Sequence, residues 1–347
     1  MEAIIGQRIR NSRVHKGFSM QEVADNIGVS KQMINKYEQG KSMPSSEKLI
    51  ALSKLFQQKV DYFFRKPEVA IGEINFRKKS KFGAKKISAL KEEIRIQIEN
   101  YLFVETICNV DNFFENPLQT IAASNENEVK KAVKQLRAHW NIGQDAIHNI
   151  IDLLEDHHIK VLEVDDETGH FDGLATIIDS KYPIIVIAKA MPIERKRFTL
   201  LHELGHLLLP LESFEEKDQE KLCNIFASEI LLSEENIITE FGSYRSRISL
   251  EELKNIQEKY GISISAIIYK LGQTKIMSQD RVKKFYQRLN FELGLKEEVE
   301  LSRYDGMEHS SRYENLVYRA ASEELISLSK ASSLLKISLD QLTANIR

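Results

Sequence analysis

Two histidines and a glutamate stand close together at His202, Glu203 and His206, inside an apolar run from 198 to 209. Residues four apart on a helix share one face, about 6 Å apart along its axis. Both imidazoles can therefore reach one metal ion at the roughly 2.0–2.1 Å typical of zinc. Glu203 follows the first histidine and could serve as general base toward a water molecule. The spacing predicts a hydrolytic Zn²⁺ site with Glu203 as its catalytic residue.

The third metal ligand is expected beyond His206, because catalytic zinc usually takes three protein ligands and a water molecule. Glu220 is the best candidate, since it opens a second apolar-periodic segment, 222–232, and would stand on a rigid helix. The other acids of the intervening segment are Glu212, Glu215, Glu216 and Asp218. An oxyanion donor is also needed. The sequence does not choose among Tyr244, Arg245 and His170 for that role.

Three short β-branched runs precede the histidine segment, at 160–164, 173–179 and 182–187. Asp179-Ser180-Lys181 predicts a tight turn between the last two. We expect a small antiparallel sheet packed on the metal-binding helix. An edge strand of such a sheet could take up a peptide substrate as a further strand.

The first 66 residues carry twelve Lys and Arg against six Asp and Glu, although the whole chain has a net charge of −2. Five short helices are predicted here, at 3–16, 19–27, 30–39, after Pro44-Ser45, and at 60–64. Ser19 and Glu22 have the spacing of a capping box. A tight Gly-containing turn joins the second and third helices, which is the geometry of a helix-turn-helix.

The third helix of that motif would lie in the major groove of DNA. Lys can donate to guanine, and Gln and Asn can pair with adenine edges. Ser19 and Lys41 would lie near phosphates and set the register. The candidate base-facing residues are Lys31, Gln32, Asn35 and Lys36.

The stretch RVHKGFSMQEVADNIGVSKQMINKYEQGKSMPS resembles XRE-type (lambda-repressor-like) helix-turn-helix domains. The resemblance implies a structural bridge between Arg13 and Glu38, and bases facing Lys31, Gln32 and Lys36. One departure is Met20, where the family often has Gln. A small helical bundle that binds protein instead of DNA is the alternative.

The segments outside these two regions differ in charge and in apolar pattern. Residues 67–89 form a linker whose part 77–86 has six basic and no acidic residues, so it is either a phosphate-contacting arm or a solvated tether. From Ser88 to Leu102 the pattern predicts an amphipathic helix, either a core helix or a dimer seam. Cys108 and Cys223 are the two cysteines, which suits a reducing compartment. Without a signal peptide or a long apolar stretch, we expect a cytoplasmic protein and no membrane partner.

A second resemblance lies in MPIERKRFTLLHELGHLLLP followed by EKLCNIFASEILLS, which is similar to the ImmA/IrrE family of metallo-endopeptidases. The resemblance implies Glu220 as the third zinc ligand and Asn224 as a site-supporting residue. Cys223 stands where the family usually has Ala, most simply as a small packing residue. Such enzymes cleave XRE-type repressors, and the order of the two domains resembles a known architecture of bacterial and phage regulators.

These observations predict a mainly α protein with a small antiparallel β-sheet, of the α+β class. A five-helix domain at 1–66 and the linker 67–89 are followed by a zincin-like peptidase domain at 90–275. A helical C-terminal region follows at 276–347; its last part has helix-turn-helix-like spacing around Ile326-Ser327, which indicates either a helical cap on the peptidase or a docking surface. Residues 296–313 are expected to form a loop.

The function predicted is a DNA-binding transcriptional regulator with a zinc-dependent endopeptidase domain. Its partners would be a double-stranded DNA operator and a protein substrate, namely a repressor, an antitoxin-like protein or the chain itself. A homodimer is a further expectation, since helix-turn-helix modules commonly bind palindromes. The alternative is a non-proteolytic repressor whose zincin-like domain senses a ligand or docks a partner. A metal-dependent hydrolase with a non-peptide substrate is the third hypothesis.

Overall fold

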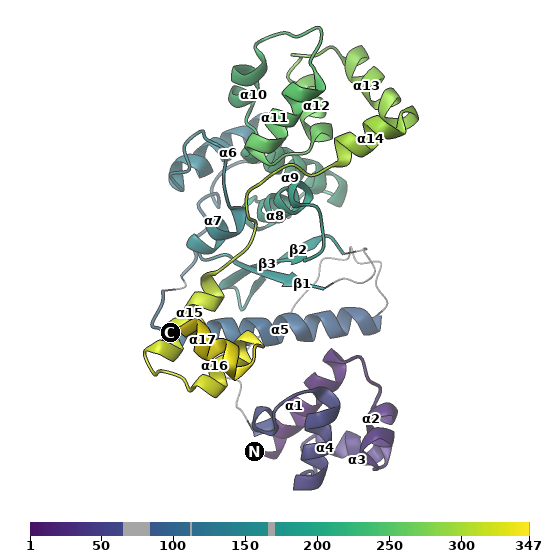
Figure 1. Cartoon of the computed structure of the whole chain (residues 1–347), viewed down its shortest axis with the longest axis vertical. Helices are drawn as coiled ribbons and strands as arrows, with labels where there is room; N and C mark the ends of the chain where they lie inside the picture. The colour runs from purple at the N-terminus through teal and green to yellow at the C-terminus, as the bar shows by residue number, and fades with distance from the viewer. Residues whose placement is uncertain (65–83, 112, 166–170, 347) are drawn as a thin grey trace. The chain divides into compact units, whose positions relative to one another are not determined.

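The structure, a computed structural model, describes residues 1–64, 84–111, 113–165 and 171–346 (Figure 1). Its contacts divide it into two compact units, one of Met1–Asp111 with Tyr313–Arg347 and one of Asn112–Arg312. The chain is mainly helical with one small sheet, which confirms the α+β class. Among the described helices, none combines the length and apolar character that a membrane span needs.

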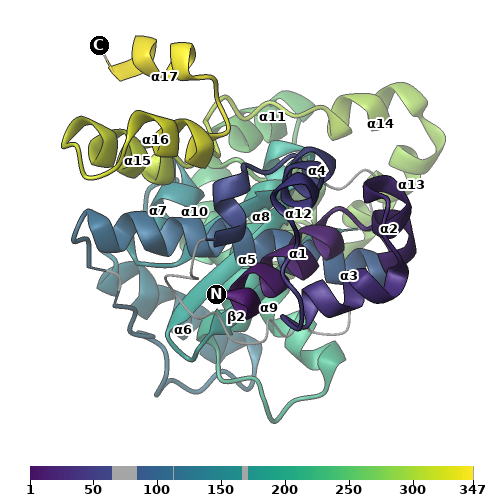
Figure 2. The ribbon, with the colours of Figure 1, turned by 90° about the horizontal axis from the view of Figure 1, so that it is seen from below.

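The first unit begins with the helical domain expected from the sequence. Its elements are α1 (Glu2–His15), α2 (Met20–Ile27), α3 (Lys31–Glu38), α4 (Ser46–Phe56) and the 3₁₀ helix η1 (Val60–Phe64). Ser19 and Glu22 form the predicted capping box, and α2 ends at Gly28 with φ 67°, where the chain turns into α3. Figure 2 shows α1, α2 and α3 together, and they share one apolar core. That core includes Ile5, Ile9, Val23, Ile34, Leu52, Phe56 and Phe63.

The same unit contains the long helix α5 (Ala84–Ile107) and the last three helices, α15 (Arg312–Ser322), α16 (Leu328–Leu335) and α17 (Leu339–Ile346). Tyr101, Val104 and Cys108 form a core with these C-terminal helices. The structure therefore groups residues 313–347 with α5, whereas the sequence favoured a cap on the peptidase domain. The basic segment 77–86 lies outside the residues whose side chains are described.

The C-terminal helices repeat the spacing of the N-terminal motif. Ser327 caps α16, Lys336 ends it at φ 56°, and Ser338 accepts a hydrogen bond from the Gln341 backbone N–H. Ser19, Gly28 and Ser30 have the same separations in α2 and α3. The helix-turn-helix-like spacing expected around Ile326-Ser327 thus corresponds to a helix-turn-helix in the structure.

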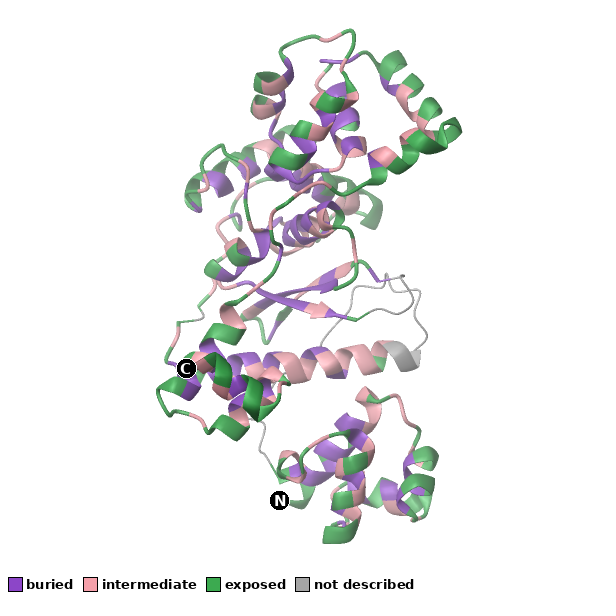
Figure 3. Ribbon diagram, viewed as in Figure 1, coloured by how far each residue is buried: buried purple, intermediate pink, exposed green. Residues whose placement is uncertain are grey.

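The second unit is built on a three-stranded sheet with the order β1-β3-β2, made of β1 (Lys160–Val164), β2 (Gly173–Ile178) and β3 (Tyr182–Ala188). Asp179 and Ser180 have φ of 52° and 55°, which is the left-handed pair of a tight hairpin turn. The central strand β3 is buried almost throughout (Figure 3). The predicted antiparallel sheet is correct for β2 and β3 but wrong for β1, which pairs with β3 in parallel.

Helices cover this sheet and complete the second unit. They are α6 (Glu126–His139), α7 (Ile150–Asp156), α8 (Ile193–Leu208), α9 (Glu216–Leu231), α10 (Glu234–Phe241), α11 (Leu250–Tyr260), α12 (Ile264–Gln273), α13 (Gln279–Phe291) and α14 (Leu293–Glu300). Helix α8 packs against β2, β3 and α9. Its buried residues include Leu200, Leu201, Leu204 and Leu208. At about 2 kcal/mol for each buried leucine, this face fixes the orientation of the histidines on the other side.

The segment after α14 also fixes α8, although the sequence predicted a polar loop at 296–313. Helix α14 extends to Glu300, and Glu308 is buried against Arg197 of α8. The Arg197 guanidinium also donates to the carbonyl oxygens of Ile147 and His148, and Glu308 accepts from the Ile150 backbone N–H. The expected loop is therefore wrong at its ends, where α14 extends into it and the following helix begins, and a buried ion pair anchors the rest.

Candidate metal centre and nucleic-acid interface

Three side chains from two helices meet at one point in the second unit. His202 and His206 of α8 and Glu220 of α9 each offer one ligand atom, and these atoms all lie within 4.8 Å of one another. His206 Nε2 is 2.9 Å from Glu220 Oε1, and His202 Nε2 is 3.4 Å from Glu220 Oε2. The sequence-based ligand set is thus brought together by the close packing of α8 and α9.

These distances suit a zinc ion. Ligands at 2.0–2.1 Å in a tetrahedral arrangement are separated from each other by about 3.3 Å. The side chains are largely enclosed, with 13% of His202, 8% of His206 and 29% of Glu220 exposed. Two imidazoles and a carboxylate are the ligand set of many catalytic zinc sites, so the residues fit the metal.

Asn224 supports the first histidine. Its Oδ1 lies 2.9 Å from His202 Nδ1, so the ring N–H can donate to the amide oxygen. With the proton on Nδ1, the lone pair of Nε2 faces Glu220, which is the tautomer a metal ligand needs.

The Glu203 side chain lies beside Gly173, the first residue of β2. A Cβ built on Gly173 would be 3.2 Å from Glu203 Cγ, so this carboxylate side chain passes the start of β2. In the three-stranded sheet, β2 is an edge strand, because β3 separates it from β1. Sequence reasoning missed Gly173, for which a glycine opening a β-branched run was the available signal.

Gly205 lets α8 and α9 approach each other. A Cβ at this position would be 3.2 Å from Cys223 Sγ, 3.2 Å from Phe226 Cδ1 and 3.3 Å from the Cys223 backbone Cα. Cys223 is fully buried at this crossing, as expected of a packing residue. The glycine between the two histidines therefore sets how near Glu220 can come to them.

The other acids considered as the third metal ligand are all exposed. Glu212 and Glu215 precede α9, and Glu216 and Asp218 lie in its first turn. Of the oxyanion candidates, Tyr244 is exposed and the Arg245 guanidinium pairs with Glu252. His170 falls outside the described residues.

A second candidate surface lies on α3 in the first unit. The side chains expected to face bases, those of Lys31, Gln32, Asn35 and Lys36, are all exposed, as are Ser19 and Lys41. Ile34 and Tyr37 are buried on the opposite face and hold the helix in place. Arg13 forms the expected bridge, with Nε 2.5 Å and Nη2 2.9 Å from the two Glu38 oxygens.

Comparison with known families matches a model to part of each unit. Residues 9–63 match the family model of the helix-turn-helix, and residues 154–272 match that of the IrrE N-terminal-like domain, a peptidase family. The chain therefore contains an XRE-type helix-turn-helix domain followed by an IrrE/ImmA-like domain. The matches fall within the predicted domains 1–66 and 90–275, whose boundaries stay predictions.

Curated relatives match the N-terminal part. An uncharacterized HTH-type transcriptional regulator, RP497 of Rickettsia prowazekii (strain Madrid E), is 34% identical over 70 residues, 20% of this chain and 54% of the relative. The SPbeta prophage-derived uncharacterized HTH-type transcriptional regulator YonR of Bacillus subtilis (strain 168) is 34% identical over 62 residues, 18% of this chain and 57% of the relative. The chain spans somewhat over half the length of these relatives.

Among solved structures, the apo form of ComR from S. thermophilus aligns with 99% of this chain and 98% of its own. The sequence identity is 12% and the TM-score is 0.18. A TM-score of this size does not establish a shared arrangement.

Proposed function

We propose that this chain is a DNA-binding transcription regulator whose IrrE-like domain is a zinc-dependent endopeptidase. The observation that carries the proposal is the convergence of His202, His206 and Glu220, with Glu203 beside them on α8. A zinc ion held by the first three would supply a Lewis acid that activates water and polarises a peptide carbonyl.

Each residue then has a defined task. Glu203 accepts a proton from the attacking water and delivers it to the leaving amine. Asn224 holds His202 in the tautomer that leaves Nε2 available. The edge strand β2, which starts beside Glu203 at Gly173, can pair with an extended peptide and hold its carbonyl near the catalytic carboxylate.

The DNA-binding part of the proposal is supported by charge and exposure. The first 66 residues have an excess of six positive charges, and α3 exposes Lys31, Gln32, Asn35 and Lys36. A helix with this surface suits the major groove, where Lys reads guanine and amides read adenine. The natural substrate would be a repressor, an antitoxin-like protein or a second molecule of this chain.

The experiment compares the full chain with Glu203→Gln. Zinc content is measured by mass spectrometry of the purified proteins, and new N-termini are mapped after incubation with candidate repressors. We expect both proteins to hold one zinc ion, and Glu203→Gln to cleave about 10²- to 10⁴-fold more slowly. If the variant regulates the same promoters as the native chain does, the non-proteolytic repressor is the correct function instead.

A further inference from the structure

A groove of about 890 Å³ extends from the metal cluster across the second unit. Glu220 and Asn224 line one end of it, so the groove is continuous with the candidate active site. Its volume lies at the upper end of the range for ligand pockets, which is about 300–1,000 Å³. The groove can therefore hold several residues of a bound chain beside the cluster.

Two helices, α9 and α12, form most of the walls of this groove. Helix α9 contributes Lys217, Lys221, Ile225 and Ser228, which recur at the spacing of one helix face, and α12 contributes Tyr269 among others. The backbone groups inside a helix bond to each other, so these walls offer side chains and no free strand edge. A peptide segment in the groove is thus recognised through side chains, in the way a helix is bound between helices.

The floor of the groove is electrically neutral. Lys270 Nζ lies 2.6 Å from Glu229 Oε2 and 3.2 Å from the Ser228 carbonyl oxygen, and both charged side chains are buried. Burial lowers the pKa of Lys270, against the attraction of Glu229. This pair holds α12 to α9 and leaves no net charge for a ligand.

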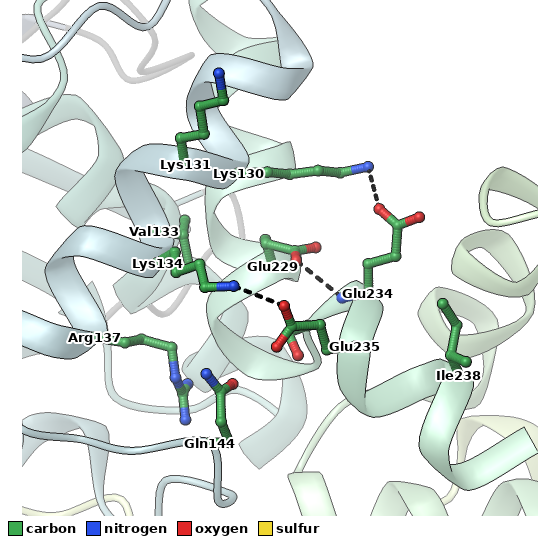
Figure 4. A pocket seen from close by; sticks show the side chains of 11 residues that line it. Lys130, Lys131, Val133, Lys134, Arg137, Gln144, Glu229, Glu234, Glu235 and Ile238 are labelled. Atoms are coloured by element: carbon green, nitrogen blue, oxygen red, sulfur yellow. Dashed lines mark hydrogen bonds and ion pairs between the residues drawn. The ribbon is translucent and has the colours of Figure 1, made fainter.

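Lys130, on the rim, is also neutralised. It pairs with Glu126 at 2.8 Å and with Glu234 at 2.9 Å. Figure 4 shows the smaller neighbouring cavity of about 370 Å³, where Lys130–Glu234 and Lys134–Glu235 cross from α6 to α10. Those two ion pairs cross the smaller cavity, whereas the larger groove reaches Glu220 and Asn224 and is therefore the candidate binding site.

The charges that remain lie next to the metal cluster. Lys217 and Lys221 are exposed one helical turn apart, and within the described part of the chain neither has an ion pair. Asp218 and Glu220 line the same end, and a zinc ion held by Glu220 would leave this end of the groove positive. An acidic side chain of a bound segment would find its partner here.

An apolar surface lies further along the groove. Ile225 and Ala266 line it, and the Tyr269 ring is 60% exposed. The Tyr286 hydroxyl donates to the Ser265 carbonyl oxygen at 2.8 Å and fixes the far wall. A large apolar side chain could pack against Ile225 and Tyr269.

We propose that this groove selects the substrate by binding an amphipathic helix of the target protein, adjacent to the extended segment that is cut. Acidic residues of that helix face Lys217 and Lys221, and an aromatic or aliphatic residue packs against Ile225 and Tyr269. The inference rests on the proposed function, since it assigns the substrate class to that same site.

The test measures binding without cleavage, so its outcome does not depend on catalysis. A phage library of random 16-residue peptides is selected on zinc-loaded full-length Glu203→Gln protein. We expect enriched peptides to carry Asp or Glu and an aromatic or leucine residue at helical spacing. Lys217→Glu with Lys221→Glu, added to Glu203→Gln, should weaken their binding at least ten-fold, and Tyr269→Ser should weaken it several-fold.

A matched double variant, Lys189→Glu with Lys283→Glu, changes two exposed lysines outside the groove and should bind the peptides unchanged. A central proline in an enriched peptide should abolish binding, because it breaks the helix. The inference is wrong if the selected peptides share no such pattern. It is also wrong if the groove variants bind the peptides as tightly as the control variant does. The enriched peptides, lengthened at both ends by an unstructured segment that could enter the cleavage site, are then offered to the native chain. Failure to cut these longer peptides despite binding counts against the peptidase alone.

Discussion

Asn224 Oδ1 lies 2.9 Å from His202 Nδ1, although the two residues are 22 positions apart and stand on different helices. The same helix α9 carries Glu220, one turn before Asn224. One element therefore supplies both a metal ligand and the acceptor that orients another ligand. The position of α9 against α8 determines the metal centre as a whole.

Asn224→Ala should lower the zinc affinity of the full chain by about 10- to 100-fold, because His202 loses the acceptor that fixes its tautomer. The affinity is measured by competition with a chromophoric chelator. Asn224→Asp keeps an oxygen acceptor and should retain most of the affinity. Asn255→Ala, an exposed asparagine of α11, is the control. An unchanged affinity in Asn224→Ala would remove the supporting role.

Gly205→Ala tests whether the close approach of α8 and α9 sets the site. Alanine favours a helix over glycine by about 1 kcal/mol, whereas overpacking a core costs about 1–3 kcal/mol. Because one of the contacts at 3.3 Å is the Cys223 backbone, we expect the free energy of unfolding to fall by about 1 kcal/mol. Zinc affinity should fall about ten-fold, since α9 carries Glu220 away from the histidines.

Chemical denaturation and chelator competition measure these two effects. Gly294→Ala in α14, where an added Cβ meets nothing within 4 Å, is the matched control and should not lose stability. Adding Cys223→Ala to Gly205→Ala removes the Sγ contact and should restore part of the zinc affinity. If Gly205→Ala binds zinc like the native chain, the glycine is not what sets the spacing.

The sequence predicted the local features of this protein well. The capping box at Ser19, the turn at Asp179-Ser180 and the face shared by His202 and His206 each depend on residues within a few positions of one another. Glu220 was also found, because a helix that starts near it places its side chain on a rigid element.

Non-local features could not be derived in this way. The apolar pattern of β1 is the same for either strand direction, so its parallel pairing with β3 depends on which strand becomes central. Glu308 lies in a polar segment, and only the fold reveals Arg197 as its buried partner. The groove between α9 and α12 likewise depends on the packing of helices far apart in sequence.

Lys36→Ala should weaken binding of the full chain to DNA. If Lys36 contacts a phosphate, the affinity falls equally for all sequences; if it contacts a guanine, the specificity for that base pair is lost. In the first case the slope of log K against log salt should decrease by about one; in the second, discrimination should fall by about 1–3 kcal/mol at one position. Binding is measured by fluorescence anisotropy at several salt concentrations. Lys54→Ala, exposed on α4, is the control. If Lys36→Ala binds DNA with the native affinity and the native salt dependence, Lys36 does not contact DNA.

The free energy of unfolding of the first unit should fall as the pH rises, because Glu92 is buried where α1 packs on α5. Burial raises the pKa of Glu92 to about 7 from 4.5, its side chain is 11% exposed, and its neighbour across the contact is the Arg8–Glu99 pair at 2.8 Å. Because the pKa of Glu92 is higher in the folded than in the unfolded state, protonation of Glu92 favours folding. This contribution to the free energy of unfolding is fully present below pH 4.5 and is lost as the pH rises through 7. The shift corresponds to about 3 kcal/mol. Denaturation from pH 4.5 to 8 should show this decline in the native chain and much less of it in Glu92→Gln. Glu47→Gln, exposed on α4, should retain the native profile; equal declines in all three proteins would contradict the assignment, because Glu92 would then not be the group that titrates.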